Sequence, residues 1–418
     1  MSRESRKNYL FLGFAIPDEE MEKVFSIDNF PQVQTHKFNW NLIKGLEHFD
    51  EFDFTYISAR PVTDYPIFSQ KKIKKNKWDV NIDDKNISIQ EIPFLNCGLL
   101  KLATRFFSTL FYSIKNYRLK PNKAGVIVYS VHIPYMIVGL IISRIYKIDY
   151  IAIWTDPPAI STNKDYGLKS KLRNIELKLS KYLMKRATKI IALTKYLAED
   201  FAPEKPYLVM EGIIDIGDIN YSTKREKDCS RDPIKIVYTG SLEKRYGIQN
   251  IVDGFLSMET KDAVLEIYGR GDFEDELVSI MKLNHNVIYK GFVRNNEILK
   301  IQREADFLIN ARSSEEEFVK YSFPSKTLEY MLSGTPLITT MLPGIPEEYR
   351  DYVIVLDNNN PEVIANKLQE VFKYSSYERN HIGMKALEFA KSKNYISQAR
   401  RIIDFIEEGW RDVVENEE

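Results

Sequence analysis

The second half of the chain alternates short apolar runs with amphipathic helical patterns, without a break. The apolar runs lie at 234–240, 263–269, 286–291, 305–310, 335–340 and 352–357. Helical patterns lie near 248–258, 273–283, 295–303, 325–333 and 361–373. This alternation predicts an α/β fold, in which a doubly wound parallel sheet is covered by helices on both faces. In such sheets ligands bind beyond the carboxyl ends of the strands.

The first half shows the same alternation less regularly. Strands are predicted at 9–16, 53–58, 125–130, 149–154, 188–193 and 206–210, and helices at 40–48, 99–116, 134–147, 168–186 and 195–201. The uncharged stretch 124–143 is long enough to span a bilayer, but Ser130, His132 and Pro134 interrupt it. We therefore interpret it as a strand, a loop and a helix that starts at the proline.

Length and composition limit the class of protein. The 418 residues suffice for two domains, and 44% hydrophobic with 28% charged residues is typical of a globular chain. A formal net charge of zero gives no support to nucleic acid as a partner. Cys97 and Cys229 lack metal or redox spacing, which fits a cytoplasmic location. Acids directly follow the first apolar stretch, which favours a strand over a signal peptide.

Polar residues separate the two halves at 216–233, and we expect a linker there. The N-terminal domain is predicted at 1–215 and the C-terminal domain at 234–395, both Rossmann-like. Two such domains should face one another across a cleft, a usual place for a small-molecule site. The last segment, 396–418, predicts one more helix, which could return to the N-terminal domain.

The segment YSFPSKTLEYMLSGTP at 321–336 predicts a short helix. Pro324 suits the first turn, Ser322 or Ser325 can cap the helix, and Gly334 can end it. Its apolar face would consist of Leu328, Met331 and Leu332. Its polar face would consist of Lys326, Glu329 and Ser333. One interpretation is a surface helix packed on a sheet. The other is an anion site, in which amides at the helix start and the Lys326 ammonium bind phosphate.

Two glycine turns follow predicted strands in the same half. In VYTGSLEKRYGI, at 237–248, Lys244 and Arg245 precede a helix, which suits either a diphosphate or an ordinary solvated turn. In YGRGDFEDEL, at 268–277, Gly269 and Gly271 lack the third glycine of a dinucleotide fingerprint. On its own this second segment predicts a tight strand-to-helix turn.

Residues for metal chemistry are not evident in the sequence. The acidic pairs do not place two carboxylates at one strand end, and the five histidines have no ligand spacing. We therefore expect no metal and no cofactor. Asp156, in IAIWTDPPAIS, follows a predicted strand of the first half. It is either a cap or turn residue or a group that contacts a sugar.

Two segments of the first half are apolar and basic. Residues 164–189 hold nine Lys/Arg against two acids, and 99–120 hold no acid. The cations of such helices are either a solvated face or a contact with an anionic membrane surface. We expect 168–186 to be the main contact of a peripheral protein, with 99–120 assisting it.

Four segments of the second half resemble a known family. They are TGSLEKRYG, EIYGRGD, ADFLINARSS and FPSKTLEYMLSGTPLITT. Together they resemble the GT-B glycosyltransferases, specifically the retaining family 4 (glycosyl transferases group 1), over about 232–375. The last segment is the most specific, because its Lys-x-x-Glu helix is followed by Ser-Gly-x-Pro.

The resemblance implies which residues bind a nucleotide-sugar donor. Glu329 matches the glutamate that grips the donor ribose in the family, and basic groups meet the diphosphate. The implied donor-binding set is Gly240, Ser241, Lys244, Arg245, Gly269, Gly271, Ser325, Lys326, Thr327 and Glu329. The chain departs from the family where Tyr321 replaces a first glutamate, where Ser241 and Tyr246 replace an arginine and a lysine, and near Thr155–Asp156, where the family has a histidine.

The implied function is a retaining, metal-independent sugar transfer from a nucleotide-diphosphate sugar to an acceptor hydroxyl. Asp156, Lys326 and Arg245 are the expected catalytic residues. The acceptor would be a glycan or a lipid-linked molecule, at the inner face of the cell membrane, in bacterial surface polysaccharide or glycoconjugate synthesis. The alternative is a GT-B-like subunit that binds sugar nucleotides without catalysis. A sugar-nucleotide epimerase would need several carboxylates together, and the sequence places none.

Overall fold

The computed structural model describes residues 6–28, 33–158, 168–217, 233–293, 295–314 and 317–408. The chain forms two compact units. Unit 1 contains the residues up to Asp215 together with helix α13 (Tyr395–Glu408), and unit 2 runs from Ile216 to Asn394. Most of the predicted linker, 218–232, lies outside the described residues, as does the end of the chain from 409.

Unit 1 is built on an eight-stranded sheet in the order β10-β9-β8-β7-β1-β2-β5-β4. Its neighbouring strands run parallel, except that β4 is antiparallel to β5. The strands are β1 (Lys7–Gly13), β2 (Phe52–Ser58), β4 (Asn76–Ile82), β5 (Lys85–Glu91), β7 (Lys123–Tyr129), β8 (Asp149–Trp154), β9 (Lys189–Ala192) and β10 (Tyr207–Val209). A separate antiparallel pair joins β3 (Lys72–Ile73) to β6 (Phe94–Leu95).

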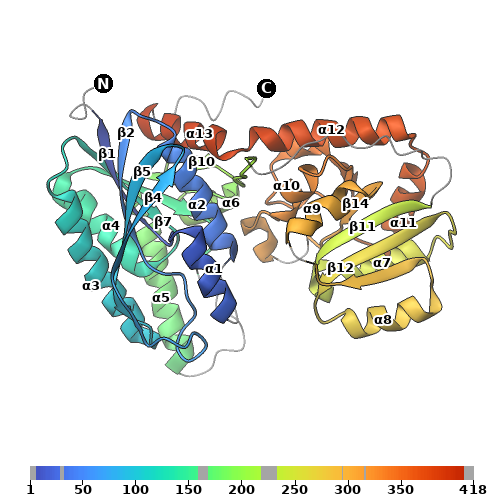
Figure 1. Ribbon diagram of the computed structural model, residues 1–418, viewed down its shortest axis with the longest axis horizontal. Coiled ribbons are helices and arrows are strands. Elements are labelled where there is room, and N and C mark those ends of the chain that lie inside the picture. Colours follow the sequence, from blue (N-terminus) through green and yellow to red (C-terminus); the bar gives the residue numbers. More distant parts are fainter. Residues whose placement is uncertain are drawn as a thin grey trace. The chain divides into compact units, whose positions relative to one another are not determined.

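Helices cover both faces of this sheet, as the alternation predicts. Helices α3, α4 and α5 lie on one side and α1, α2 and α13 on the other (Figure 1). Helix α4 contacts both α3 and α5, and α13 packs against α2. The bounds are α1 (Asp18–Ile27), α2 (Val33–Glu47), α3 (Gly98–Tyr117), α4 (Ile133–Tyr146), α5 (Leu168–Met184) and α6 (Lys195–Phe201).

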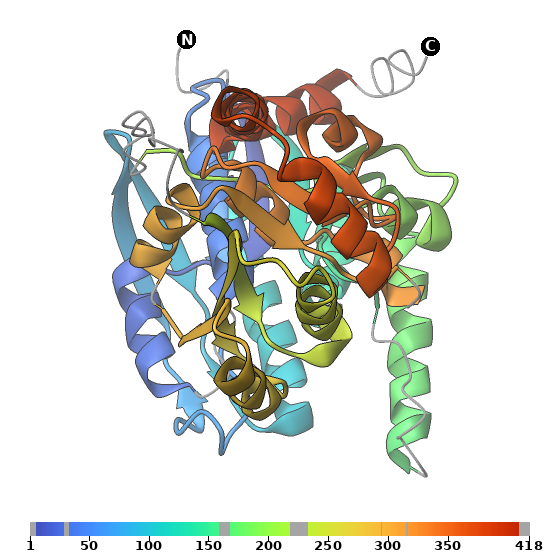
Figure 2. The same ribbon diagram turned by 90° about the vertical axis from the view of Figure 1, so that its right-hand side faces the viewer.

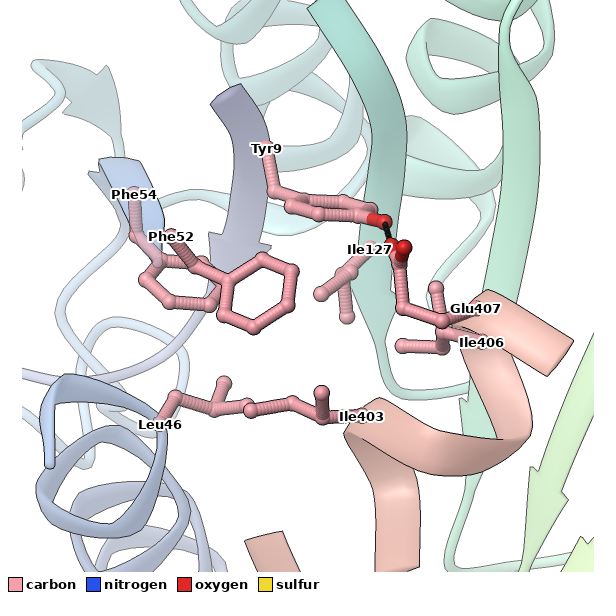
Figure 3. Close-up of a pocket in the computed structure, with 8 residues that line it drawn as sticks. All are labelled: Tyr9, Leu46, Phe52, Phe54, Ile127, Ile403, Ile406 and Glu407. Carbon is pink, nitrogen blue, oxygen red and sulfur yellow. Dashed lines mark hydrogen bonds between the residues drawn. The ribbon is translucent and has the colours of Figure 1, made fainter. Parts of the chain in front are cut away.

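Helix α13 closes the end of the sheet where β1 and β2 begin. The Tyr9 hydroxyl donates to Glu407 Oε1 at 2.7 Å, and Lys7 pairs with the same carboxylate. Burial and the Glu407 carboxylate raise the pKa of Tyr9. Figure 3 shows the small, largely apolar pocket beneath this contact, lined by Tyr9, Leu46, Phe52, Phe54, Ile127, Ile403, Ile406 and Glu407. The pocket lies away from the carboxyl edge, where parallel sheets bind ligands.

The structure confirms the strand–loop–helix interpretation of 124–143, because this stretch forms β7 and most of α4. Within the described ranges, no helix is long and apolar enough to cross a membrane. Helix α1 and the β4–β5 hairpin were not predicted from the sequence. The hairpin turns at Asp83 and Asp84, whose φ angles are 46° and 66°. Two residues with positive φ between alternating strands are a hairpin signal, but Asp-Asp is weaker than Asn-Gly.

Unit 2 is built on a six-stranded parallel sheet in the order β13-β12-β11-β14-β15-β16. The strands are β11 (Ile234–Ser241), β12 (Ala263–Arg270), β13 (Val287–Gly291), β14 (Phe307–Asn310), β15 (Leu337–Thr340) and β16 (Ile354–Leu356). Its helices are α7 (Ile248–Leu256), α8 (Glu274–Leu283), α9 (Asn295–Arg303), α10 (Lys326–Met331), α11 (Pro361–Val371) and α12 (Ser376–Ser392).

Each strand and helix predicted for this half is present, with ends that differ by up to two residues. Buried side chains at alternate strand positions, such as Ile236, Leu265 and Ile309, pack with α7, α8 and α11 into a core on one face of the sheet. Helix α12 was missed, although its capping box, in which Ser375 and Glu378 bond reciprocally, is a sequence signal. Helix α12 packs on α10, and a side chain at Gly383 would meet the Gly334 carbonyl oxygen at 2.1 Å.

Candidate functional site

The carboxyl edge of the unit 2 sheet collects the residues that the sequence singles out. Strands β12, β11, β14 and β15 are neighbours there. Gly240 pairs with Gly269 across the first two strands, and Ser241 pairs with Arg270. The loops after these strands therefore share one edge, which is where a parallel sheet binds its ligand.

Backbone packing accounts for both glycines of the β12 turn. A side chain at Gly269 would meet the Gly240 carbonyl oxygen at 1.8 Å, and its φ is 148°. A side chain at Gly271 would meet the Leu242 carbonyl carbon at 2.3 Å. Since real Cβ atoms do not approach so closely, glycine is required at each position.

The Gly271 amide already has a partner within the protein. It donates to Glu274 Oε1 at 2.8 Å, and the Tyr289 hydroxyl donates to the other oxygen of this carboxylate at 2.8 Å. These two bonds hold the pKa of Glu274 below its usual value. The geometry is that of the tight strand-to-helix turn, and it leaves the Gly271 amide no free hydrogen for a phosphate.

Helix α10 is shorter than predicted, and its start differs from the predicted anion site. The Ser325 side chain makes no capping bond, so Ser325 is not the cap, although it was one of the two serines predicted for that role. The Thr327 amide donates to the Pro324 carbonyl at 2.8 Å, and the buried Thr327 hydroxyl has no partner in the described structure. The predicted apolar face is buried, but Ser333 is buried too, because its hydroxyl donates to the Tyr330 carbonyl.

Glu329 is oriented by two donors. Lys326 Nζ lies 2.8 Å and Gln302 Nε2 lies 3.1 Å from Glu329 Oε1. The same Gln302 nitrogen donates to Thr239 Oγ1 at 3.0 Å, and the Tyr330 hydroxyl donates to the Thr239 carbonyl at 2.7 Å. Thr239 directly precedes Gly240, so this buried network fixes α10 and Glu329 to the end of β11. Gln302 was missed, since nothing near it in the sequence marks a partner.

Lys244 and Arg245 occupy a 3₁₀ turn that follows β11. The Lys244 ammonium pairs with Glu276, and the hydrogen bond to this carboxylate raises the pKa of the lysine. Arg245 pairs with Glu243. Both cations are therefore at the predicted edge, each beside a carboxylate that the sequence analysis did not assign to it.

Arg312 is a further cation at this edge that the sequence analysis did not select. It follows β14, and its guanidinium lies over the Tyr246 ring at 4.6 Å. Its Nε is buried without a partner, and no ion pair of Arg312 occurs in the described ranges. Its place directly after a parallel strand was the signal that could have identified it.

Asp156 belongs to the other unit. It is exposed just beyond β8, accepts a hydrogen bond from Thr155 Oγ1 at 2.9 Å, and contributes, after burial, to raising the pKa of Tyr129. His132 lies past the next strand along the sheet, β7, and contacts the rings of Phe14 and Tyr135. Burial, and then the nearby cations, hold the pKa of His132 well below 6.5, so this ring is neutral.

A metal site does not emerge from the described residues, which contain no group of three His, Cys, Asp or Glu side chains arranged to hold an ion. Tyr321, which stands where the resemblance expects a glutamate, is buried. It therefore leaves Glu329 as the acidic residue of this segment that faces the edge of the sheet.

A comparison with known protein families matches the segment of the chain that forms this candidate site. Residues 233–373 match the sequence model of the family "Glycosyl transferases group 1". The match contains the carboxyl edge of unit 2 from Gly240 to Thr340, with Glu329 and Arg312 inside it.

Two curated relatives are uncharacterized glycosyltransferases of Methanocaldococcus jannaschii. MJ1607 is 28% identical over 160 residues, which cover 35% of this chain and 40% of the relative. MJ1069 is 22% identical over 247 residues, which cover 54% of this chain and 60% of the relative. The matches thus span about half the length of these relatives.

Solved structures resemble the whole chain. OtsA in its apo form has a TM-score of 0.63 at 9% identity, over 96% of this chain and 99% of that one. Sucrose-phosphate synthase of Thermosynechococcus elongatus has a TM-score of 0.61 at 12% identity, over 96% and 98%. Anabaena HepE in complex with UDP has a TM-score of 0.57 at 14% identity, over 96% and 99%. The chain therefore has the GT-B fold, with two Rossmann-like units.

Proposed function

We propose that this protein is a glycosyltransferase that moves a sugar from a nucleoside diphosphate donor to an acceptor hydroxyl. The observation that carries the proposal is the position of Glu329. Its carboxylate is oriented at the end of β11 by Lys326 and Gln302, inside the segment matched by the glycosyltransferase family. A carboxylate held in this way can accept hydrogen bonds from the two hydroxyls of a donor ribose.

The chemical requirement of the reaction is to stabilise the departing nucleoside diphosphate. Lys244, Arg245 and Lys326 supply positive charge at the edge, and Arg312 adds a guanidinium that pairs with no carboxylate among the described residues. Cations preorganised where negative charge develops lower the barrier, and the loss of one such donor typically costs about 3 kcal/mol in the transition state. HepE, which shares the fold, has been crystallised with UDP and UDP-glucose.

Unit 1 would hold the acceptor, a glycan or a lipid-linked molecule, on the cytoplasmic side of the membrane. Asp156, exposed beyond β8, would orient the acceptor or the donor sugar. We further propose that the transfer retains the anomeric configuration by attack on the face that the leaving group vacates, without a metal. We also propose that the transfer serves bacterial surface polysaccharide or glycoconjugate synthesis.

A sugar-nucleotide-binding subunit without catalysis is the second candidate, and Tyr321 favours it. The buried ring replaces a glutamate of the family pattern, which removes one acidic group from the edge. The two candidates share a bound nucleotide and differ in whether the sugar–phosphate bond is broken.

Release of nucleoside diphosphate from a panel of nucleotide sugars, without acceptor, separates the candidates. A transferase should release it slowly by transfer to water, and release should persist in excess chelator. Glu329→Gln keeps an acceptor for Gln302 and should still slow release at least tenfold, because the carboxylate charge is lost. Glu370→Gln, which alters another Glu–Lys pair at 2.7 Å, should not.

Binding of a nucleotide sugar without any release would establish the non-catalytic candidate. Release that stops in chelator and returns with magnesium or manganese would contradict the metal-independent mechanism. The configuration of the product, read by NMR, would contradict retention if it were inverted.

A further inference from the structure

Helix α3 turns polar side chains inward. Its buried residues are Lys101, Arg105, Thr109, Ser113 and Tyr117, which recur every four positions and lie along one face of the helix. Lys101 Nζ donates to the Val62 carbonyl at 2.8 Å and to Asp64 at 2.6 Å. The Arg105 guanidinium donates to the Arg60 carbonyl and lies over the Phe94 ring. Internal partners thus hold Lys101 and Arg105 on the buried face of α3, although that face is polar.

The outward face of α3 is apolar instead. The exposed fractions are 71% for Leu99, 57% for Leu100, 67% for Phe107 and 59% for Phe111. Leu119, just past the helix, is 80% exposed. Isolated exposed apolar residues are common on soluble proteins, but a stripe of large ones along one helix marks an interaction surface. We refer to these five residues as the α3 stripe.

Positive charge lies at one end of the α3 stripe and along α5. The segment 98–120 contains no acid, and Lys115 and Arg118 are exposed at the end of the helix. Lys171 and Lys178 on α5 are exposed, as is Lys185 just past its end, and the three recur every seven residues. None of these five cations has an ion pair in the described parts of the chain. Unpaired cations next to exposed apolar rings favour a surface that is anionic outside and apolar beneath.

Helices α3 and α5 lie on the same side of the unit 1 sheet. Helix α4 contacts both of them and lies between them (Figure 1). Figure 2 shows α5 (green) set apart from α3 (cyan), so the lysines extend the positive region beyond the α3 stripe. On α5, Ile175 and Tyr182 are 62% and 49% exposed and stand between its lysines in the sequence.

We propose that this side of unit 1 docks on an anionic lipid surface, with the α3 stripe inserted at the boundary between headgroups and acyl chains. The cations of α3 and α5 would contact the headgroups. The sequence suggested 168–186 as the main contact, but exposure assigns the apolar part of the contact to α3. The inference concerns the outer helices of unit 1 and does not depend on the sugar-transfer proposal.

Co-sedimentation with vesicles tests this contact. At low salt the protein should pellet with vesicles of equal phosphatidylglycerol and phosphatidylcholine, and far less with phosphatidylcholine alone. Phe107→Ser and Phe111→Ser should each weaken partition about tenfold, at every salt concentration, since they remove apolar insertion. Both side chains are exposed, so the variants should fold.

Lysine variants test the contribution of charge to vesicle binding. Lys171→Gln, Lys178→Gln and Lys185→Gln should each weaken partition about fivefold at low salt, and this loss should vanish at high salt, where charges are screened. The double variant Leu283→Ser/Tyr377→Ser, with two side chains of unit 2 that are 83% and 78% exposed, is the matched control and should partition like the native protein.

Two results would overturn the proposal. The first is equal sedimentation of the native protein and the Phe107→Ser/Phe111→Ser variant, or no sedimentation of either. The second is a native dimer in ultracentrifugation that the same variant converts to a monomer without any vesicle binding, because the α3 stripe would then be an interface between copies of this chain.

Discussion

The carboxyl edges of the two sheets bury different groups. In unit 2, backbones meet closely at Gly269 and Gly271, and the charged groups, such as Lys326 and Glu329, stay partly exposed. In unit 1, aromatic rings surround a neutral His132 beyond β7, and Asp156 is exposed beyond β8. The cations at the edge of unit 2 suit an anionic ligand, whereas the exposed group beyond β8 in unit 1 is an aspartate. Two sheets of the same class can thus be specialised by the residues that follow their strands.

Among the changes that test this difference between the units, Gly269→Ala should have the largest effect, which is a loss of stability in unit 2. The new Cβ would meet the Gly240 carbonyl oxygen at 1.8 Å, and neither backbone can move without breaking the pairing of β11 and β12. We expect unit 2 to lose more than about 4 kcal/mol of stability, or to fail to fold. Gly291→Ala is the matched control: its φ is also positive, at 74°, but no atom lies within 4 Å, so it should cost only about 1 kcal/mol. Denaturant unfolding measures both, and equal losses would contradict the close approach.

Glu91→Ala tests the buried anchor of unit 1. Glu91 accepts two hydrogen bonds from Arg60, at 2.7 and 3.1 Å, and one from Trp78 at 2.9 Å. Its removal leaves a mostly buried guanidinium without this partner, which should cost about 3 kcal/mol. Asp79→Ala, an exposed position of the same hairpin, should cost under about 0.5 kcal/mol. A Glu91→Ala protein as stable as the control would show that the hairpin is held by other contacts.

Arg312→Met should weaken donor binding about tenfold, because it removes a cation of this edge whose Nε is buried without a partner in the described structure. The methionine keeps apolar contact with Tyr246, so stability should change little. Lys282→Met removes an exposed cation from the end of α8 and is the control. Affinities by titration calorimetry that match between the two variants would remove Arg312 from the proposed site.

The pH dependence of unit 1 stability should show a smaller effect. His132 has a depressed pKa in the folded state and its usual value of 6.5 when unfolded. The stability that the neutral ring contributes is therefore fully present above pH 6.5. Below that pH the free energy of unfolding falls by about 1 kcal/mol per pH unit. His132→Gln should reduce this slope in urea unfolding series, and an unchanged slope would mean that the ring is protonated in the folded protein.

Regular alternation made unit 2 predictable from sequence, because each buried strand reads as an apolar run between helices. The β4–β5 hairpin was not predictable in this way, because polar and apolar residues are mixed in its exposed strands, as in NKWDVNI, and its turn is Asp-Asp. At the site, the position of Glu329 on a short helix was predictable, but its partner Gln302, which is 27 residues away, was not. The pairing of Lys244 with Glu276 was likewise not predictable, because the two residues belong to loops that only the sheet brings together.

Calorimetric titration of the native protein and Glu329→Gln with a panel of nucleoside diphosphates tests the central claim most directly, that the carboxyl edge of unit 2 binds the donor nucleotide. We predict that one nucleoside diphosphate binds the native protein, that Glu329→Gln weakens it by about 2 kcal/mol, and that Glu370→Gln does not change it. The ribose contact with an oriented carboxylate is the reason. Equal affinity of the native protein and Glu329→Gln, in variants that remain folded, would contradict the account.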